Sequence, residues 1–155
     1  MHKLEIFADY RQFYVWDAGA GPSAPIDYTD EDLRNRIKVG PNVVVIQPIR
    51  NMTVPVELEV CSSDPGVDLS RWDHVVECSL DVPTGALQVH ECTGGPVLDL
   101  SVTPGTYCVR AHFGGLGLLA EDGLRGADHY RVSLWRQDIA PFRILKQWAG
   151  PPFAG

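Results

Sequence analysis

The residues of this chain with the clearest chemical potential are a group of carboxylates near the N-terminus. Asp27, Asp30, Glu31 and Asp32 lie close together, and Thr29 precedes three of them. A threonine can cap a helix N-terminus, where acidic side chains are stabilised by the helix dipole. The same carboxylates can attract a positively charged partner. We therefore treat the four acids as candidate partner-binding residues, with helix capping as the structural alternative.

A glycine-rich segment, Gly114–Gly126, is the second candidate. It is the longest interior segment without strand periodicity, and it carries Glu121 and Asp122 beside several leucines. Loops of this length in compact domains are often functional. We predict that Glu121 and Asp122 are further partner-binding residues. The alternative is a loop that packs over one end of the fold through Leu116, Leu118 or Leu119.

No known catalytic motif is found in the sequence. It lacks a nucleophile elbow and the His-Glu signature of metalloproteases, and the glycines from Gly114 to Gly117 are not followed by the Lys-Ser/Thr pair of a phosphate loop. The five histidines lie in different segments. His129 beside Asp128 is a pairing that an unrecognised enzyme could use, but nothing positions a nucleophile. We predict a non-catalytic protein with no metal site and no cofactor.

Two binding alternatives remain open. Asp64 and Asp68 lie in a loop where a sandwich can bind calcium, although a calcium ion needs six to eight oxygens and the sequence identifies no further ligands. Outward-pointing tryptophans could form a sugar-stacking platform, although packing in the core or at its rim is favoured. The tryptophans concerned are Trp16, Trp72, Trp135 and Trp148. The alternative function is therefore a small-ligand or carbohydrate-binding sandwich.

Length, composition and charge narrow the class of protein. The chain has 155 residues, of which 45% are apolar and 21% charged, and this suits one folded domain. We predict a single domain over residues 1–148 and a flexible C-terminal tail over residues 149–155. The formal net charge of −7 repels phosphate backbones, so nucleic acid is not an expected partner.

The apolar segments and the cysteines suggest where the protein resides. The longest aliphatic run, Val43–Ile46, is far shorter than the ~20 residues of a membrane-spanning helix. The N-terminus lacks the apolar segment of a signal peptide. We therefore expect no membrane span and a cytoplasmic location. The four cysteines form no C-x-x-C pair and are expected to be reduced.

Apolar and polar residues alternate through most of the chain after Val43, as expected for half-buried strands. The alternation is clearest in Val54–Val60 and Tyr107–Phe113, and turn residues separate such runs. The pattern predicts an all-β fold, an antiparallel two-sheet β-sandwich of about eight or nine strands. One short peripheral α-helix is expected near residues 29–38. An open barrel is the alternative.

The order of several short sequence runs is that of a known family. In the N-terminal half the runs are Tyr10–Val15, Ile26–Glu31, a strand through Val45, and Arg50-Asn51. Looser matches downstream are Val97–Leu100, Pro104–Tyr107 and Asp128–Val132. In this order the chain resembles the competence protein J family, small proteins described as inhibitors of a DNA-entry nuclease. The region from Asp64 to Cys92 departs from the family pattern.

The resemblance implies a protein that binds and blocks a nuclease rather than an enzyme. A nuclease active site attracts phosphate, so an inhibitor can cover it with carboxylates that imitate the charge of the substrate. The expected partner is then a protein of the nuclease class, and the expected contact residues are the two acidic groups, Asp27, Asp30, Glu31 and Asp32 together with Glu121 and Asp122.

Overall fold

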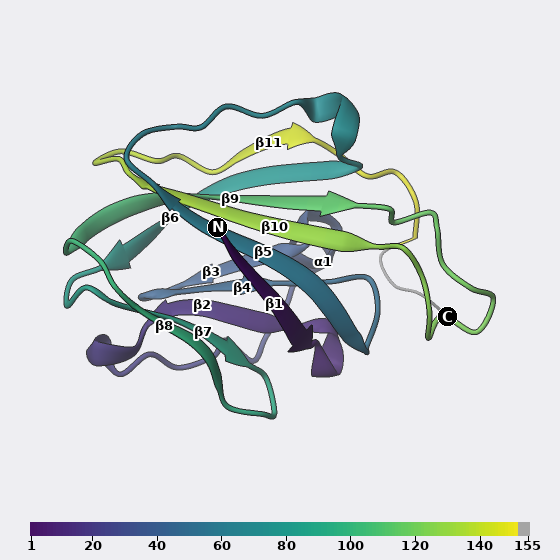
Figure 1. Ribbon diagram of the computed structural model, residues 1–155, viewed down its shortest axis with the longest axis horizontal. Coiled ribbons are helices and arrows are strands. Elements are labelled where there is room, and N and C mark those ends of the chain that lie inside the picture. The colour runs from purple at the N-terminus through teal and green to yellow at the C-terminus, as the bar shows by residue number, and fades with distance from the viewer. Residues whose placement is uncertain (152–155) are drawn as a thin grey trace.

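The computed structural model describes residues 1–151, in which eleven strands form two stacked sheets (Figure 1). The six-stranded sheet has the order β1 (His2–Phe7), β5 (Thr53–Cys61), β10 (His129–Arg136), β9 (Gly105–Gly114), β6 (His74–Val82) and β11 (Arg143–Lys146). The five-stranded sheet has the order β3 (Ile37–Gly40), β4 (Val43–Ile46), β2 (Phe13–Asp17), β7 (Ala86–Glu91) and β8 (Pro96–Ser101). The predicted all-β, two-sheet sandwich is confirmed, and the open barrel is wrong.

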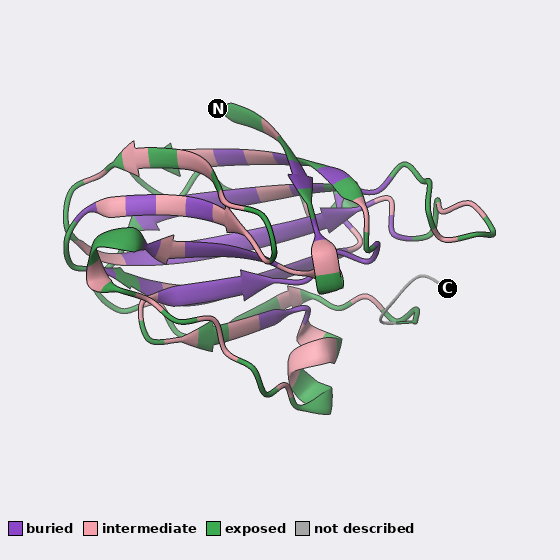
Figure 2. Ribbon diagram, turned by 90° about the horizontal axis from the view of Figure 1, so that it is seen from below, coloured by how far each residue is buried: buried purple, intermediate pink, exposed green. Residues whose placement is uncertain are grey.

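The alternation read from the sequence produces the core. In β5 the side chains of Val54, Val56 and Leu58 are buried, whereas those of the intervening residues are exposed or half-buried. Both sheets contribute such inward-facing residues to one apolar cluster. Burying a Val or Leu side chain contributes about 1.5–3 kcal/mol, so this cluster dominates the stability of the fold. Figure 2 shows the buried positions concentrated in the strands.

One strand pair departs from the expected antiparallel arrangement. β5 and β10 run parallel, with Tyr130 opposite Val56, whereas every other strand pair in residues 1–151 is antiparallel. Parallel neighbours need a long connection, and here most of the sandwich lies between the two strands. The residues that precede β5 and β10 therefore lie at the same end of the sheet.

The helix is shorter than the prediction over residues 29–38. α1 spans Asp30–Asn35, and three 3-10 turns occur at Asp9–Arg11, Ala18–Ala20 and Leu69–Arg71. Arg36 has a left-handed backbone (φ 61°) and ends the helix, so that buried Ile37 can begin β3. Lys38 belongs to β3 and not to the helix. Packing of Ile37 in the core outweighs the helical preference of this segment.

The last described residues pack against the helix end. The Trp148 amide donates to Nδ1 of His74 (3.0 Å), so Nε2 of His74 donates to the Asn35 carbonyl (2.8 Å). Arg36 donates to the Pro151 carbonyl (2.9 Å).

Residues 152–155, part of the predicted tail, lie outside the described residues. The division at residue 148 stays a prediction. Within residues 1–151, no helix is both long and apolar enough to cross a membrane.

Candidate functional site

The acidic segment at α1 contains one carboxylate that is committed to the fold. Asp32 accepts from the Thr29 amide (2.9 Å), while the Thr29 hydroxyl accepts from the Asp32 amide (3.1 Å), which forms a capping box. Lys38 pairs with the same carboxylate at 2.9 Å. Burial disfavours the charged form, but the hydrogen bonds from Lys38 and Thr29 outweigh it and lower the pKa of Asp32. Asp32 is thus neutralised within the protein.

The other acids of this segment remain available to a partner. Asp27, Asp30 and Glu31 are exposed. Within residues 1–151, the carboxylates of Asp30 and Glu31 make no hydrogen bond or ion pair. The hydrogen bond that Lys38 donates to Asp32 is the main cause that raises the pKa of Lys38, and the charge of Asp27 adds a smaller contribution. Asp30 and Glu31 are therefore the free carboxylates of the predicted group.

The second acidic group lies on an ordered hairpin. Residues 115–128, which we call the 115–128 hairpin, connect β9 to β10 and contain a bridge between Leu119 and Gly126. Cross-hairpin hydrogen bonds run from Ala127 N to Leu118 O and from Ala120 N to Arg125 O. The predicted packing role holds for Leu116, which is buried, and Leu119, which packs against the core, whereas Leu118 is exposed.

The two acids of the hairpin differ in their surroundings. Glu121 is exposed and makes no hydrogen bond or ion pair within residues 1–151. Asp122 accepts from the Leu124 amide (2.9 Å) and lies 3.8 Å from Arg125, which is itself exposed. Exposed pairs of this kind contribute about 0–1 kcal/mol, so Asp122 can exchange its partner at little cost.

The fold brings both acidic groups to one end of the sandwich. Asn35, the last residue of α1, is hydrogen-bonded to His74 at the start of β6, and His74 pairs with Phe113 at the end of β9, where the hairpin begins. In Figure 2 α1 projects below the strands, and the hairpin extends beyond their right-hand ends. Trp148 lies between them, because a Cβ added at Gly117 would lie 3.7 Å from its ring. On the other side, Trp148 lines a hollow of about 270 Å³ beside α1. We call this surface, formed by α1, Trp148 and the hairpin, the acidic end.

A buried ion pair that the sequence did not reveal holds the base of the hairpin. Nε of Arg50 lies 2.6 Å from Oδ1 of Asp128, and both side chains are buried. Tyr130 donates to Oδ2 of Asp128 (2.6 Å) and accepts from the Ile49 amide (3.0 Å). Burial and the Asp128 charge raise the pKa of Tyr130 well above its ordinary value, so its hydroxyl stays protonated. The parallel pairing of β5 and β10 creates this contact.

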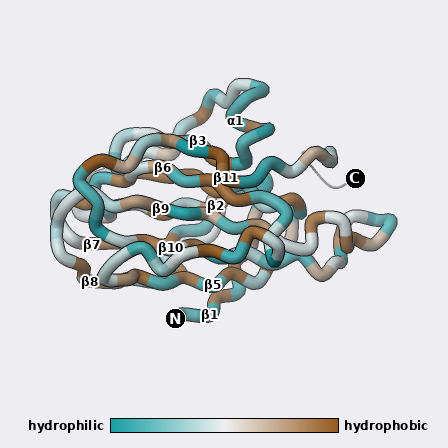
Figure 3. Tube along the Cα trace, turned by 90° about the horizontal axis from the view of Figure 1, so that it is seen from above, coloured by the Kyte–Doolittle hydropathy of each residue, from teal (hydrophilic) through white to brown (hydrophobic). Residues whose placement is uncertain are grey.

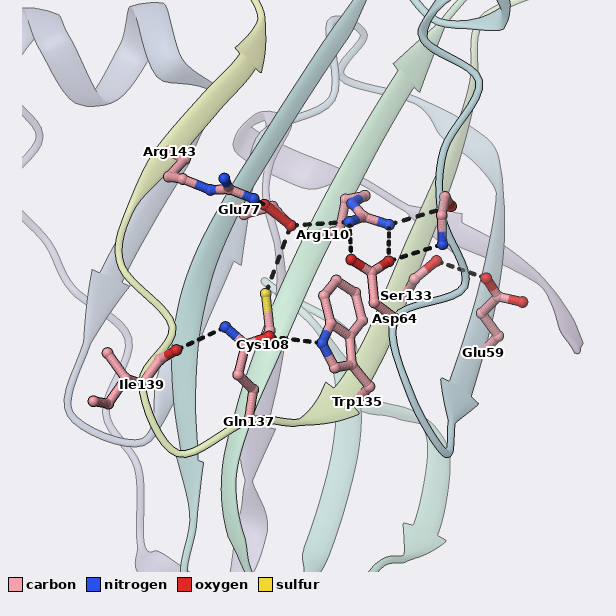
Figure 4. Close-up of polar contacts among 11 residues, drawn as sticks. Glu59, Asp64, Glu77, Cys108, Arg110, Ser133, Trp135, Gln137, Ile139 and Arg143 are labelled. Atoms are coloured by element: carbon pink, nitrogen blue, oxygen red, sulfur yellow. Dashed lines mark hydrogen bonds and ion pairs between the residues drawn. The ribbon is translucent and has the colours of Figure 1, made fainter.

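A second charged cluster lies on the outer face of the six-stranded sheet (Figure 4). Arg110 makes two bonds to Asp64, at 2.9 and 3.0 Å, and a third to Glu77 at 3.1 Å. Arg143 also pairs with Glu77, at 2.5 Å. The Cys108 thiol lies in this cluster, and burial raises its pKa to about 12, so it is not a nucleophile. These charges compensate one another and attach the segment after β5 to the sheet.

The calcium and enzyme alternatives find no support in the geometry. Asp64 is neutralised by Arg110, and no group of three or more metal-binding side chains occurs within residues 1–151. Asp128 is engaged with Arg50 and Tyr130, while His129 points its Nδ1 at the Ala127 carbonyl (3.1 Å). The two neighbours therefore do not form a catalytic pair.

The tryptophans do not form an exposed platform. Trp72 and Trp135 are buried, and Trp16 and Trp148 are half-buried. Trp135 stacks under Arg110, with 4.6 Å from the guanidinium carbon to the ring centre. Trp16 donates to Gln88 (2.8 Å) and stacks with Tyr14. Sugar binding through stacked, outward-facing indoles is therefore not favoured.

The four cysteines form no disulfide in the structure. All four are free thiols, and Cys78 and Cys108 are buried while Cys61 and Cys92 are half-buried. The Cys92 thiol accepts from the Tyr14 hydroxyl (3.1 Å) on the outer face of the five-stranded sheet. These thiols serve as small packing groups and weak hydrogen-bond partners.

Comparison with known proteins identifies the fold. No protein-family model matches the chain, and no curated protein matches it in sequence. One similar structure is the crystal structure of ComJ from Bacillus subtilis, an inhibitor of the DNA-degrading activity of NucA. The TM-score is 0.66 and the sequence identity 16%, and the match covers 88% of this chain and 94% of ComJ. The protein described as crocagin biosynthetic gene J is similar with a TM-score of 0.58 and 19% identity, covering 88% of this chain and 97% of that one. The expected resemblance to competence protein J is thereby confirmed at the level of the fold.

Proposed function

We propose that this protein is a non-catalytic binding protein that inhibits a nuclease through its acidic end. The observation that carries the proposal is the location of three carboxylates, on Asp30, Glu31 and Glu121, that have no partner within residues 1–151 and lie toward one end of the sandwich. The fold is similar to that of ComJ, an inhibitor of the DNA-degrading activity of NucA. Carboxylates without internal partners contribute little to the fold, so they are free to contact a basic surface.

The electrostatic argument favours a phosphate-binding partner. A nuclease active site carries positive potential where the DNA backbone binds, and a set of carboxylates can occupy that potential in place of phosphates. Opposite charges also accelerate encounter, by an amount that falls with ionic strength. The net charge of −7 adds a long-range attraction to the local one. A metal or a cofactor is not part of the proposal.

The decisive experiment titrates the purified chain into a DNA-degradation assay. NucA is the first nuclease to use, and the second is any DNA-degrading protein that the immobilised chain captures from a lysate of the organism that carries it. We expect stoichiometric inhibition of at least one of them. The Asp30→Asn/Glu31→Gln variant should bind roughly tenfold more slowly at low salt, because two steering charges are removed.

A matched control removes two charges elsewhere. Asp99 in β8 and Asp138 after β10 are exposed, and Asp138 lies at the opposite end of β10 from the hairpin. The Asp99→Asn/Asp138→Asn variant should inhibit like the parent chain. Equal slowing by both variants would reduce the effect to net charge, and no inhibition of either nuclease by the parent chain would refute the proposal.

A further inference from the structure

We propose that the 115–128 hairpin is a preformed docking element, whose exposed Leu118 and Leu124 enter an apolar hollow within the positively charged surface of the partner. The inference rests on the proposed function, because the partner is the nuclease. It adds an apolar centre to a site so far described by its charges, and it identifies the residues that would carry most of the affinity.

The leucines of the hairpin fall into two groups. Leu116 is 2% exposed and anchors the hairpin in the core, whereas Leu118 is 65% and Leu124 is 52% exposed. A single exposed leucine is ordinary on a protein surface. Here two lie on one projecting segment, which Figure 2 shows extending beyond the sheets. Interfaces place such apolar side chains at their centre and charged ones around them.

The hairpin is held in one conformation from several sides. Nη1 of Arg50 donates to the Leu124 carbonyl (2.7 Å), and the Leu116 amide donates to Asp73 (2.8 Å). Gly115 has φ +64°, and a Cβ added there would lie 2.4 Å from the Ala127 carbonyl oxygen. A segment that is already ordered loses less conformational entropy on binding than a mobile one. Exposure of its leucines is therefore a property of the folded hairpin.

The charges around the leucines indicate the chemistry of the partner. Glu121 has no hydrogen bond or ion pair within residues 1–151, and the only cation near Asp122 in that range is the exposed Arg125 at 3.8 Å. Asp30 and Glu31, in the first turn of α1, contribute further exposed negative charge. In Figure 3 the hairpin has both hydrophilic and hydrophobic stretches along its length. An apolar centre with an acidic rim fits an apolar hollow with a basic rim.

The test compares two double variants in binding and inhibition of the nuclease identified as above. In Leu118→Ala/Leu124→Ala the two exposed side chains of the hairpin are shortened. In Val60→Ala/Ile139→Ala the changes fall on exposed residues at the opposite end of the sandwich. Each lost hot-spot leucine should weaken binding about tenfold, so the first variant should bind roughly 100-fold more weakly. The control should bind within about threefold of the parent chain.

The outcomes separate this inference from the proposed function. The unfolding midpoint of Leu118→Ala/Leu124→Ala should lie close to that of the parent, because both side chains are more than half exposed, so weakened binding will not reflect misfolding. If the parent chain inhibits a nuclease and the Leu118→Ala/Leu124→Ala variant does so with unchanged affinity, the hairpin inference is overturned and the proposed function stands. If the parent chain inhibits neither NucA nor a captured nuclease, both are overturned.

Discussion

Replacing Arg50 by methionine should expose how the base of the 115–128 hairpin is held. The substitution keeps an unbranched side chain of similar length but removes the guanidinium that pairs with Asp128 at 2.6 Å and donates to the Leu124 carbonyl. Asp128 is 1% exposed and keeps only the Tyr130 hydroxyl as a partner. The variant therefore leaves a charge that is buried and incompletely compensated.

The expected magnitude follows from that burial. Breaking a buried ion pair by removing one partner costs about 3–5 kcal/mol, because the remaining charge has lost its solvation. For a chain of this size each kcal/mol lowers the melting temperature by about 2–4 °C, so the Arg50→Met variant should melt roughly 6–20 °C below the parent. Urea denaturation followed by tryptophan fluorescence gives the free energy of unfolding.

Two controls isolate the buried charge. The Arg50→Met/Asp128→Asn variant removes both charges and should recover part of the loss, because a neutral amide is less costly to bury than a carboxylate. Arg125→Met breaks a surface pair on the same hairpin and should change stability by less than about 1 kcal/mol. A loss below about 1 kcal/mol in Arg50→Met, or equal losses in the single and double variants, would contradict the reasoning.

Three further predictions test the helix cap, a tight glycine and a buried histidine. Thr29→Ala removes the capping hydroxyl and should lower the free energy of unfolding by about 1 kcal/mol in urea denaturation; no change would mean that the cap is not formed in solution. Gly115→Ala should lower the free energy of unfolding more than Gly21→Ala does. Both glycines have positive φ, but only an added Cβ at Gly115 would lie within 4 Å of a backbone oxygen. Equal unfolding midpoints of the two variants would contradict this. Burial lowers the pKa of His74 to about 4 in the folded protein, whereas the pKa in the unfolded chain is about 6.5. The stability that the neutral, buried imidazole contributes is therefore fully present above pH 6.5 and is lost as the pH falls towards 4. The loss at pH 4.5 should be about 2–3 kcal/mol in urea denaturation, and His74→Gln should show a smaller pH dependence; an unchanged slope would refute the role of this residue.

The strands and the core could be predicted because their pattern is local. Val54, Val56 and Leu58 show their burial by alternation alone. In β9 the alternation marks the inward-facing residues, but the polar residues between them, Arg110 and His112, are buried as well. The number of strands was predicted too low, since the structure has eleven. β11 was missed because it is short and its burial does not alternate clearly. Residues of an edge strand have neighbours on one side, and this weakens the sequence signal.

The long-range features could not be predicted from local patterns. The parallel pairing of β5 and β10 depends on two strands that are distant in sequence, and it alone places Arg50 beside Asp128. The left-handed backbone of Arg36 ends α1 early because the core requires Ile37. In both cases tertiary packing decides a local conformation that propensity would have resolved differently.

The candidate site was predicted in part. The sequence indicated both acidic groups, but it could not show that they lie at the same end of the sandwich. It also could not separate Asp32, which is bound by Thr29 and Lys38, from Asp30 and Glu31, which have no such partners within residues 1–151. Whether a carboxylate is free depends on neighbours brought together by folding, and this is why the capping and binding alternatives stayed open.

Amide hydrogen exchange of the chain with and without the inhibited nuclease tests the central claim most directly. We predict that binding slows exchange in residues 27–35 and 115–128, the two segments of the acidic end, and leaves exchange in residues 101–106 and 137–140 unchanged. Slowed exchange confined to residues 101–106 and 137–140, at the opposite end of the sandwich, would contradict the account.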